Sequence, residues 1–305
     1  MDWSAARRWL GLGDIPLREL ECRYAGGGSR FAEVRGLRVH YRDEGEGPVL
    51  LMLHGVFSSL HTWEGWVERL RGRYRLVRPD VPGFGLTGPP ADVVGMVRDI
   101  EGVLDEFADA LGLGSFSLAG SSLGGYFAWR YALARPERVE RMVLISSAGY
   151  PLRMPPLLRL ASTPVFGDFF RFVSPRPLVR MSLREVYADR RRVTGELVRR
   201  YHELMLRPGN RRTLRAASSE LMRQFAAHHS EIRRIATPTL VMWGEEDRWI
   251  PPHHARRFVR DLQNASLVTY PGVGHVPMEE SPERTAADAD AFLSGRPTRM
   301  QKSVF

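Results

Sequence analysis

A serine stands at the centre of a G-x-S-x-G pattern, in the segment GSSLG at positions 120–124. This pattern is typical of a nucleophilic hydroxyl on a tight turn between a strand and a helix. The required setting is present, because residues 115–119 have strand character and residues 123–134 have helical character. The outer positions of such a turn lie so close to neighbouring backbone that only glycine fits. We therefore expect Ser122 to be a nucleophile; the alternative is a glycine-rich turn without chemistry.

A serine hydroxyl needs a base to take its proton, and nine histidines compete for this role. His275 lies in the glycine-rich segment PGVGHVP at 271–277, just after the predicted strand 266–270. The carboxyl ends of parallel strands meet at one edge of a sheet, so this loop is expected to reach Ser122. We expect His275 to be the base, and a solvated loop histidine is the alternative.

The base in turn needs a carboxylate that orients it and stabilises its charged form. Three acidic residues follow the predicted strand 239–243, in the segment GEED at 244–247. We expect Asp247 to be this carboxylate. Glu245 and Glu246 remain competitors, because spacing alone does not separate the three.

Other titratable residues near strand ends have structural explanations. His54 directly follows a buried strand and is expected to organise its own loop. Asp80 also follows a strand, and we expect it to brace the loop PGFG at 82–85. Two histidine pairs without metal-ligand partners are expected at the surface, at positions 228–229 and 253–254.

Two backbone N–H groups are needed where negative charge develops on the substrate oxygen. The N–H of Leu123 is one candidate, because it begins a helix whose dipole favours negative charge. The loop after the buried run VLLML at 49–53 is expected to supply the second donor. Its first candidate is the N–H of Val56 and its second is that of Phe57. An ordinary turn is the alternative for this loop.

Short apolar segments of strand character alternate with helical segments along most of the chain. The predicted strands are residues 38–43, 49–53, 74–78, 115–119, 139–145, 239–243 and 266–270. The predicted helices are residues 63–70 (with Thr62 as N-cap), 96–111, 123–134, 253–261 and 282–293. This alternation predicts an α/β fold with a mainly parallel sheet and helices on both faces.

Between residues 150 and 236 the alternation stops, and prolines and helical segments such as 194–206 and 211–225 replace it. We expect a helical cap inserted between two strands of the sheet. The predicted organisation is an N-terminal extension (1–30), a first part of the core (31–149), the cap (150–236), a second part of the core (237–293) and a flexible tail (294–305).

Together these features resemble the α/β-hydrolase superfamily over about residues 31–293. Ser122, Asp247 and His275 stand in the chain order of that family's catalytic triad. The chain is most similar to the lipase/esterase-like branch of the family, which has a helical cap. The similar features are the His-Gly step at 54–55, Trp63, the PGFG loop at 82–85, the GVGH loop at 272–275 and the place of the insertion. The resemblance implies a cofactor-free serine hydrolase of carboxylic esters that acts through an acyl-enzyme intermediate.

Neighbouring families in the superfamily supply the alternatives. Haloalkane dehalogenases and epoxide hydrolases use an aspartate nucleophile, and Ser122 argues against both. Proline iminopeptidases usually have a longer His-Gly-Gly-Pro-Gly loop than HGVF at 54–57. Hydrolases of ring-cleavage diketones and cofactor-free perhydrolases use the same triad and stay open, although the diketone hydrolases usually have Gly and Ser where Val56 and Phe57 stand. A non-catalytic binding protein on a hydrolase fold is the alternative of another class.

The predicted cap is rich in methionine and phenylalanine, most of which should pack on the sheet. A minority is expected to line a pocket for apolar acyl or alcohol groups, and methionines favour broad specificity. The substrate-binding candidates are Phe57, Ser121, Phe166, Met181, Met222 and Val276.

The formal net charge is +9, and residues 150–236 hold 18 arginines against 7 acidic residues, so the rest of the chain carries −2. The sequence lacks zinc-ligand spacing, a basic region with heptads and an RNA-binding signature, so we expect no nucleic-acid partner. The basic cap and the Trp and Arg residues of the first ten positions are typical of weak contact with a membrane surface. The favoured interpretation is a solvated face for the cap arginines and an ordinary docking helix for the first ten residues.

The single cysteine, Cys22, excludes an intrachain disulfide. The sequence shows neither a signal-peptide pattern nor an apolar run of about 20 residues, so we expect a cytoplasmic protein. We expect no cofactor and no metal, and a small-molecule ester as the partner of the site.

Overall fold

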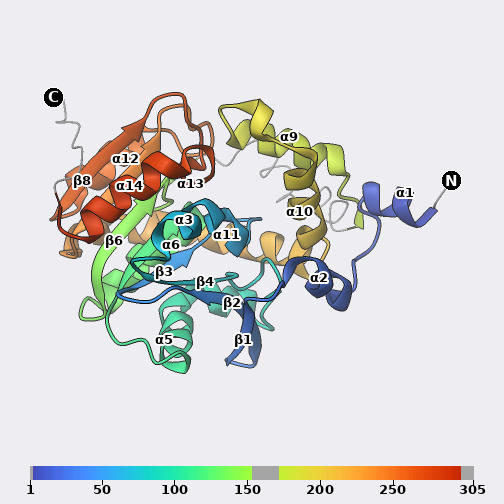
Figure 1. Ribbon diagram of the computed structural model, residues 1–305, viewed down its shortest axis with the longest axis horizontal. Helices are drawn as coiled ribbons and strands as arrows, with labels where there is room; N and C mark the ends of the chain where they lie inside the picture. The colour runs from blue at the N-terminus through green and yellow to red at the C-terminus, as the bar shows by residue number, and fades with distance from the viewer. Residues whose placement is uncertain (1–2, 153–171, 297–305) are drawn as a thin grey trace.

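A single eight-stranded sheet forms the centre of the protein (Figure 1). The computed structural model describes residues 3–152 and 172–296. The strands are β1 (Ser29–Val34), β2 (Leu37–Glu44), β3 (Val49–Leu53), β4 (Arg75–Pro79), β5 (Phe116–Ser121), β6 (Val139–Ile145), β7 (Thr239–Gly244) and β8 (Ala265–Tyr270). They lie in the order β1-β2-β4-β3-β5-β6-β7-β8, and only the pairings of β2 are antiparallel. The predicted α/β fold with a mainly parallel sheet is confirmed.

The parallel part of the sheet brings the candidate site residues to one edge. The strands from β4 to β8 all run in the same direction. The loops that follow β3, β5, β7 and β8 therefore leave the carboxyl edge of the sheet together. These four loops carry the predicted oxyanion donors, nucleophile, acid and base.

Helices cover both faces of the sheet. They are α1 (Trp3–Trp9), α2 (Leu17–Tyr24), α3 (Glu64–Leu70), α4 (Val93–Arg98), α5 (Ile100–Ala110), α6 (Leu123–Ala134), α9 (Arg176–Val186), α10 (Gly195–Met205), α11 (Asn210–His228), α12 (His253–Asp261), α13 (Pro277–Glu280) and α14 (Pro282–Leu293), with 3₁₀ turns η1 (Leu60–Trp63), η2 (Arg190–Arg192) and η3 (His229–Arg234).

Strand side chains alternate between the two faces and so build two cores. On β3, Leu51 and Leu53 join the core that contains residues of α5, α6 and α12. Leu50 and Met52 join the other core, with residues of α3 and α14. All residues of β5 and β7 are buried, as expected for central strands covered on both faces. The end of β5, where the nucleophile follows, is therefore held rigidly.

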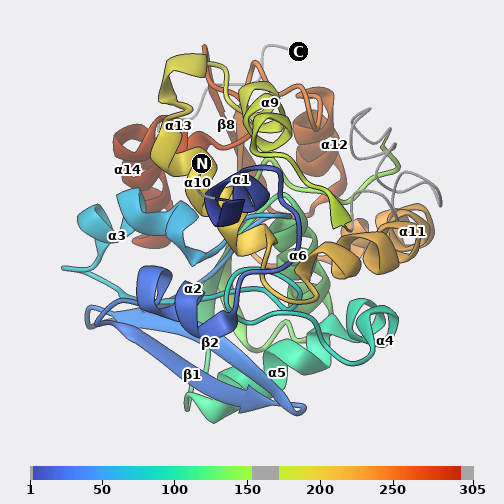
Figure 2. The same cartoon turned by 90° about the vertical axis from the view of Figure 1, so that its right-hand side faces the viewer.

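The chain between β6 and β7 forms α9, η2, α10, α11 and η3. Both views of the ribbon place α9 and α10 at one end of the molecule, beside α1 and α2 (Figures 1 and 2). A small apolar cluster joins α2 to this insertion and consists of Ile15, Leu20, Leu86, Leu204 and Leu206. In the described part of the chain, none of the helices is both long and apolar enough to cross a membrane.

Two predicted helices differ from the structure. The helix predicted at 96–111 is divided into α4 and α5, because Asp99 leaves helical geometry at φ −123° and ψ 45°. Its carboxylate instead accepts a hydrogen bond from the Gly102 N–H at the start of α5. Thr62 is not the N-cap of α3, since it lies inside η1 and its hydroxyl bonds to Glu279. The elements α2, β1, α9 and α13 were not predicted, whereas α1 agrees with the docking helix expected in the first ten residues.

Candidate active site

Ser122 lies at the apex of a strained turn between β5 and α6. Its backbone has φ +55° and ψ −114°, a conformation that residues other than glycine rarely adopt. The turn is held by hydrogen bonds from the Ser122 N–H to the Ile145 carbonyl (3.0 Å) and from the Ala148 N–H to the Ser122 carbonyl (3.0 Å). Backbone strain at a fixed, buried serine is a frequent feature of nucleophile positions.

The two glycines of the motif are required by close backbone approach. A Cβ at Gly120 would lie 2.3 Å from the Gly124 carbonyl oxygen. A Cβ at Gly124 would lie 2.1 Å from the carbonyl oxygen of Leu53 at the end of β3. The sequence argument that no side chain fits at either position therefore agrees with the geometry.

His275 and Asp247 form a buried pair. The His275 Nδ1 lies 2.8 Å from the Asp247 Oδ2, and both side chains are almost fully buried. The other carboxylate oxygen, Oδ1, accepts hydrogen bonds from the N–H groups of Trp249 (2.8 Å) and Ile250 (2.9 Å). The carboxylate is thus fixed in one orientation, and the Nε2 of His275 is the ring atom left for proton transfer.

The loop that carries His275 turns back over the end of β7. A Cβ on Gly244, the last residue of β7, would lie 2.0 Å from the Gly274 carbonyl oxygen. The backbone of Val273 and Gly274, directly before His275, therefore lies against the end of β7. Among the three candidates, hydrogen bonding joins His275 to Asp247, and within the described residues no hydrogen bond joins the Ser122 hydroxyl to the His275 ring.

The competing residues lie elsewhere. Glu245 and Glu246 are both exposed, and the Glu245 carboxylate accepts a hydrogen bond from the Thr269 hydroxyl (2.7 Å). His254, expected at the surface, is in fact 3% exposed. Its ring lies against that of Tyr150, and burial lowers its pKa to about 4. The contact with Tyr150, in the segment that follows β6, accounts for this difference from the expectation.

The loop after β3 presses against the nucleophile. A Cβ at Gly55 would lie 3.1 Å from the Ser122 Cβ and 3.7 Å from its Oγ. Phe57 has a left-handed backbone at φ +60°. The N–H groups of Val56, Phe57 and Leu123 donate to no acceptor within residues 3–152 and 172–296. All three N–H groups therefore stay candidates for the oxyanion donors.

His54 and Asp80 have structural roles, as expected. The Nε2 of His54 accepts a hydrogen bond from the Val81 N–H (2.9 Å), and its Nδ1 lies 2.8 Å from the Gly55 carbonyl oxygen. Burial lowers the pKa of His54, which keeps this ring neutral. The ring therefore ties the oxyanion loop to the loop after β4.

Asp80 is the centre of a second buried network. Its carboxylate accepts hydrogen bonds from the N–H groups of Leu60 and Leu86 (2.7 Å each) and lies 2.7 Å from the Nδ1 of His40. The His40 Nε2 lies 2.7 Å from the Ser29 hydroxyl. Burial alone would raise the pKa of the Asp80 carboxyl, but the hydrogen bond and charge of His40 outweigh it and lower the pKa. Ser29 bonds to the Ala25 carbonyl and lies on no strained turn, so the network braces loops rather than presenting a nucleophile.

We predict that Asp80→Asn destabilises the protein by about 3–5 kcal/mol at neutral pH, because it leaves His40 buried without its charged partner. A depressed pKa stabilises the fold above the unfolded carboxyl value of about 4, and this part is lost as pH falls. The deficit in urea unfolding should thus be largest near pH 7 and shrink toward pH 3. Asp189→Asn is the control, since Asp189 also has a lowered pKa, beside Arg191, but is exposed to solvent. Equal loss in both variants would contradict the bracing role.

Contacts that sequence reasoning missed attach the helical insertion to the His275 loop. The His275 N–H donates to the Val186 carbonyl at the end of α9 (2.8 Å). The Glu280 carboxylate accepts from the N–H groups of Gly274 (2.7 Å), Ala188 (2.9 Å) and Asp189 (3.1 Å). Burial raises the pKa of Glu280 although these N–H groups oppose the shift. The only sequence signal for these contacts was Glu280 itself, the second glutamate of the segment PMEE. From the sequence alone it cannot be distinguished from a surface glutamate.

The substrate-binding candidates are scattered among different environments. Ser121 (1% exposed) and Val276 (7%) are buried, and Met222 packs against the core formed with α6 and α12. Met181 on α9 is 50% exposed, and Phe166 lies outside the described residues. Trp249 was not predicted, yet its ring centroid lies 5.6 Å from that of His275. Among the described side chains, no group of three or more His, Cys, Asp or Glu residues is arranged to hold a metal ion.

Comparison with known proteins identifies the family. A family model described as the alpha/beta hydrolase fold matches residues 48–282, more than half of the chain. The chain belongs to the α/β-hydrolase family. This hydrolase is 32% identical to a 2-hydroxy-6-oxononadienedioate/2-hydroxy-6-oxononatrienedioate hydrolase of Burkholderia vietnamiensis, over 81% of this chain and 88% of the relative. It is 31% identical to the pimeloyl-[acyl-carrier protein] methyl ester esterase of Nitrosomonas europaea, over 83% of this chain and 99% of the relative.

Solved structures show the same architecture. A membrane phospholipase A superimposes with a TM-score of 0.74 at 29% identity and covers 92% of this chain and 89% of its own. The α/β-hydrolase fold with helices on both sides of the sheet is therefore shared over nearly the whole length of the protein.

Proposed function

We propose that the protein is a serine hydrolase that cleaves carboxylic esters through an acyl-enzyme intermediate. The observation that carries the proposal is the environment of Ser122. A serine in a strained backbone conformation lies against the Gly55 loop, and N–H donors without protein acceptors flank it. Such fixed donors beside a nucleophile stabilise an oxyanion and are worth about 3 kcal/mol each.

In the proposed mechanism the Ser122 Oγ attacks the ester carbonyl carbon while the His275 Nε2 takes its proton. Asp247 holds the His275 Nδ1 at 2.8 Å, which fixes the tautomer and stabilises the imidazolium. The N–H of Leu123, together with that of Val56 or Phe57, receives the developing oxyanion. His275 then returns the proton to the leaving alcohol, and water releases the acid by the same route. The residues need no cofactor for these steps.

Cleavage of a C–C bond in a ring-cleavage diketone is the second candidate, because one relative at 32% identity is named as a dienedioate hydrolase and another at 31% as a methyl ester esterase. The apolar pair Val56-Phe57 in the oxyanion loop favours the ester. No polar side chain at these two positions is available to bind the enol or carboxylate of a dienedioate. A cofactor-free perhydrolase and a non-catalytic binding protein remain the further alternatives.

We expect kcat/KM for a neutral short-chain p-nitrophenyl ester to exceed that for a 2-hydroxy-6-oxo dienoate by at least about tenfold, since an apolar site leaves the diketone's polar groups unpaired. Both substrates would be assayed with the same enzyme preparation, by nitrophenolate release and by loss of dienoate absorbance. Ser122→Ala serves as the blank for both. A faster reaction with the dienoate would assign C–C bond hydrolysis instead, and no turnover of either would favour the binding protein.

A further inference from the structure

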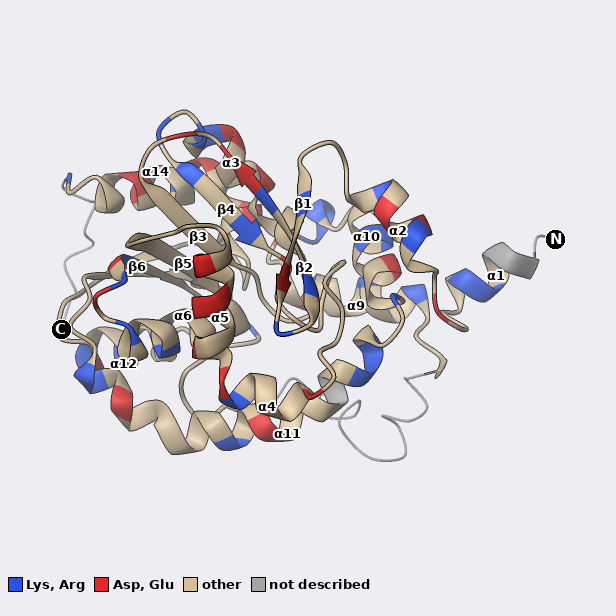
Figure 3. Cartoon of the chain, turned by 90° about the horizontal axis from the view of Figure 1, so that it is seen from below, with Lys and Arg blue, Asp and Glu red and all other residues tan. Residues whose placement is uncertain are grey.

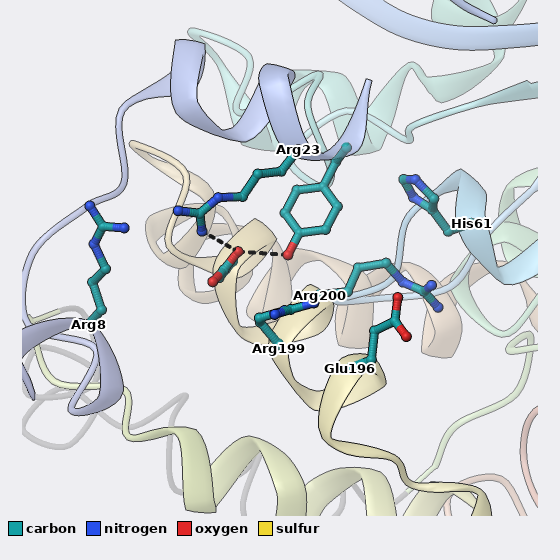
Figure 4. A pocket seen from close by; sticks show the side chains of 8 residues that line it. Arg8, Arg23, His61, Glu196, Arg199 and Arg200 are labelled. Atoms are coloured by element: carbon teal, nitrogen blue, oxygen red, sulfur yellow. Dashed lines mark hydrogen bonds and ion pairs between the residues drawn. The ribbon is translucent and has the colours of Figure 1, made fainter. Parts of the chain in front are cut away.

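A cavity lies between the N-terminal helices and the insertion (Figure 4). Its volume is about 720 Å³. Its walls come from α1, α2, η1 and α10, and the lining residues are Arg8, Arg23, Tyr24, His61, Glu196, Arg199, Arg200 and Glu203. None of the candidate catalytic residues is among them.

The cavity contains the charged face of α10. Glu196, Arg199, Arg200 and Glu203 are spaced by three and four residues, so they share one side of the helix. The opposite side is apolar, and its Leu197, Val198 and Leu204 are buried. This face borders the cavity opposite α1 and α2, with Glu196 and Arg199 exposed and Arg200 partly buried. Figure 3 shows basic residues on both α1 and α10. Basic side chains from two walls thus line the same cavity.

Two of the four arginines in the cavity have carboxylate partners. Arg23 donates to Glu203 (2.7 Å) and Glu19 (2.5 Å), and Arg8 donates to Glu19 (2.6 Å). The Tyr24 hydroxyl also donates to Glu203 (2.7 Å), at the same oxygen, Oε2, that accepts from Arg23. A guanidinium has five N–H groups, so Arg8 and Arg23 keep donors in reserve.

Arg199 and Arg200 have no such partners. Within the described part of the chain, neither guanidinium makes a hydrogen bond or an ion pair, nor does the Glu196 carboxylate. The Nε of Arg200 is buried without a hydrogen-bond acceptor. A buried donor left without an acceptor is costly, and each such group needs a reason.

The remaining wall is neutral. The His61 ring lies 6.1 Å from the Tyr24 ring, centroid to centroid, and its Nδ1 is 3.0 Å from the Ser59 hydroxyl. Burial lowers the pKa of His61 to about 4, and the charge of Arg200 contributes to the shift. The positive charge inside the cavity at neutral pH is thus that of the arginines, with Glu196 as the one carboxylate that no arginine neutralises.

We propose that this cavity is a binding site for a phosphate group, held by Arg199 and Arg200 from α10 and by Arg8 and Arg23 from the opposite wall. Guanidinium groups recognise phosphate through paired, charge-assisted hydrogen bonds. Phosphate fits better than a planar carboxylate, because its several acceptor oxygens point in different directions and the arginines approach from two walls. The group belongs either to a soluble phosphate compound or to a phospholipid headgroup. The inference is independent of the proposed ester hydrolysis.

The test is isothermal titration of the whole protein with inorganic phosphate at constant ionic strength. We expect saturable binding that Arg199→Gln/Arg200→Gln weakens at least tenfold, about the effect of losing charge-assisted hydrogen bonds. The matched control is Arg184→Gln/Arg212→Gln, which removes the same charge at two exposed arginines outside the cavity. Binding of the control should stay within about twofold of wild type. If the double variant fails to fold, Arg199→Gln alone replaces it, because Arg199 is exposed.

A second arm identifies the source of the phosphate. Wild type and variants are sedimented with phosphatidylcholine vesicles with and without phosphatidic acid. Binding that needs phosphatidic acid and is lost in Arg199→Gln/Arg200→Gln supports the site and assigns a lipid headgroup. Titration with free phosphate but no such vesicle binding supports the site and assigns a soluble ligand. Absence of binding in both arms, or an equal loss in the control variant, overturns the proposal.

Discussion

Ser122→Ala is expected to lower kcat for a short p-nitrophenyl ester by about 10⁴-fold or more while the protein stays folded. The size of the effect follows from the position of the residue. Ser122 is the motif residue at the apex of the turn, and its hydroxyl makes no hydrogen bond within the described structure. Removing the hydroxyl therefore removes the attacking atom and little else. Thermal unfolding of the variant should match that of wild type.

The neighbouring serine supplies the control for this experiment. Ser121 is 1% exposed and pairs with Ile145 in the sheet, so Ser121→Ala should keep most of the activity. Wild type should also react stoichiometrically with a fluorophosphonate, and Ser122→Ala should not. If Ser122→Ala kept the wild-type rate, or if the label were found on another residue, Ser122 would not be the nucleophile.

Local sequence patterns predicted the bounds of an element correctly where its apolar pattern is continuous and ends at a clear signal. Helix α6 and strand β6 have the predicted bounds, and so do α12 and α14. In each, an apolar pattern ends at a proline, a glycine or a polar loop, so the local signal and the tertiary environment agree. The turn at Ser122 belongs to the same class, because steric exclusion of a Cβ at Gly120 and Gly124 is a local property.

Tertiary contacts decided the features that the sequence did not reveal. Continuous amphipathic character hides the break at Asp99, where a side-chain cap competes with the helix. The strand β1 is an edge strand whose residues are mostly partly buried, so it lacks a clear alternation. The hydrogen bond from the His275 N–H to the Val186 carbonyl joins residues that are 89 positions apart in the chain. No pattern within either segment announces such a contact.

The candidate acid shows how the structure separates residues that sequence spacing does not distinguish. Three carboxylates follow β7 in succession, and the sequence favours Asp247 only by its place in the motif. In the structure Glu245 and Glu246 are exposed, whereas the Asp247 side chain is fully buried and hydrogen-bonded to His275. The same reasoning applies to the charge of the insertion. Composition gives the total charge of the insertion, but only the fold reveals that Arg199 and Arg200 line a cavity together with Arg8 and Arg23.

Asp247→Asn is expected to lower kcat by about 10⁴-fold without unfolding the protein, because it changes the tautomer of the base. The amide oxygen of asparagine can keep the hydrogen bonds from the Trp249 and Ile250 N–H groups that now reach Oδ1. Its NH₂ group then occupies the place of Oδ2 and donates to the His275 Nδ1, which today lies 2.8 Å from a carboxylate oxygen. The ring proton moves to Nε2, so the nitrogen that should take the Ser122 proton is already protonated.

The ranking of two variants makes this prediction discriminating. Glu246→Gln removes one negative charge one position earlier in the same loop, but from an exposed side chain, so its kcat should stay within about twofold of wild type. We expect equal melting temperatures for the two variants, because the atom at the Oδ1 position keeps its two N–H partners in Asp247→Asn. The difference in kcat would then reflect the catalytic step and not the stability of the fold. The opposite ranking would move the acid to Glu246. Activity close to wild type in Asp247→Asn would exclude the buried pair from the mechanism, because a histidine held in the wrong tautomer has no lone pair to offer Ser122.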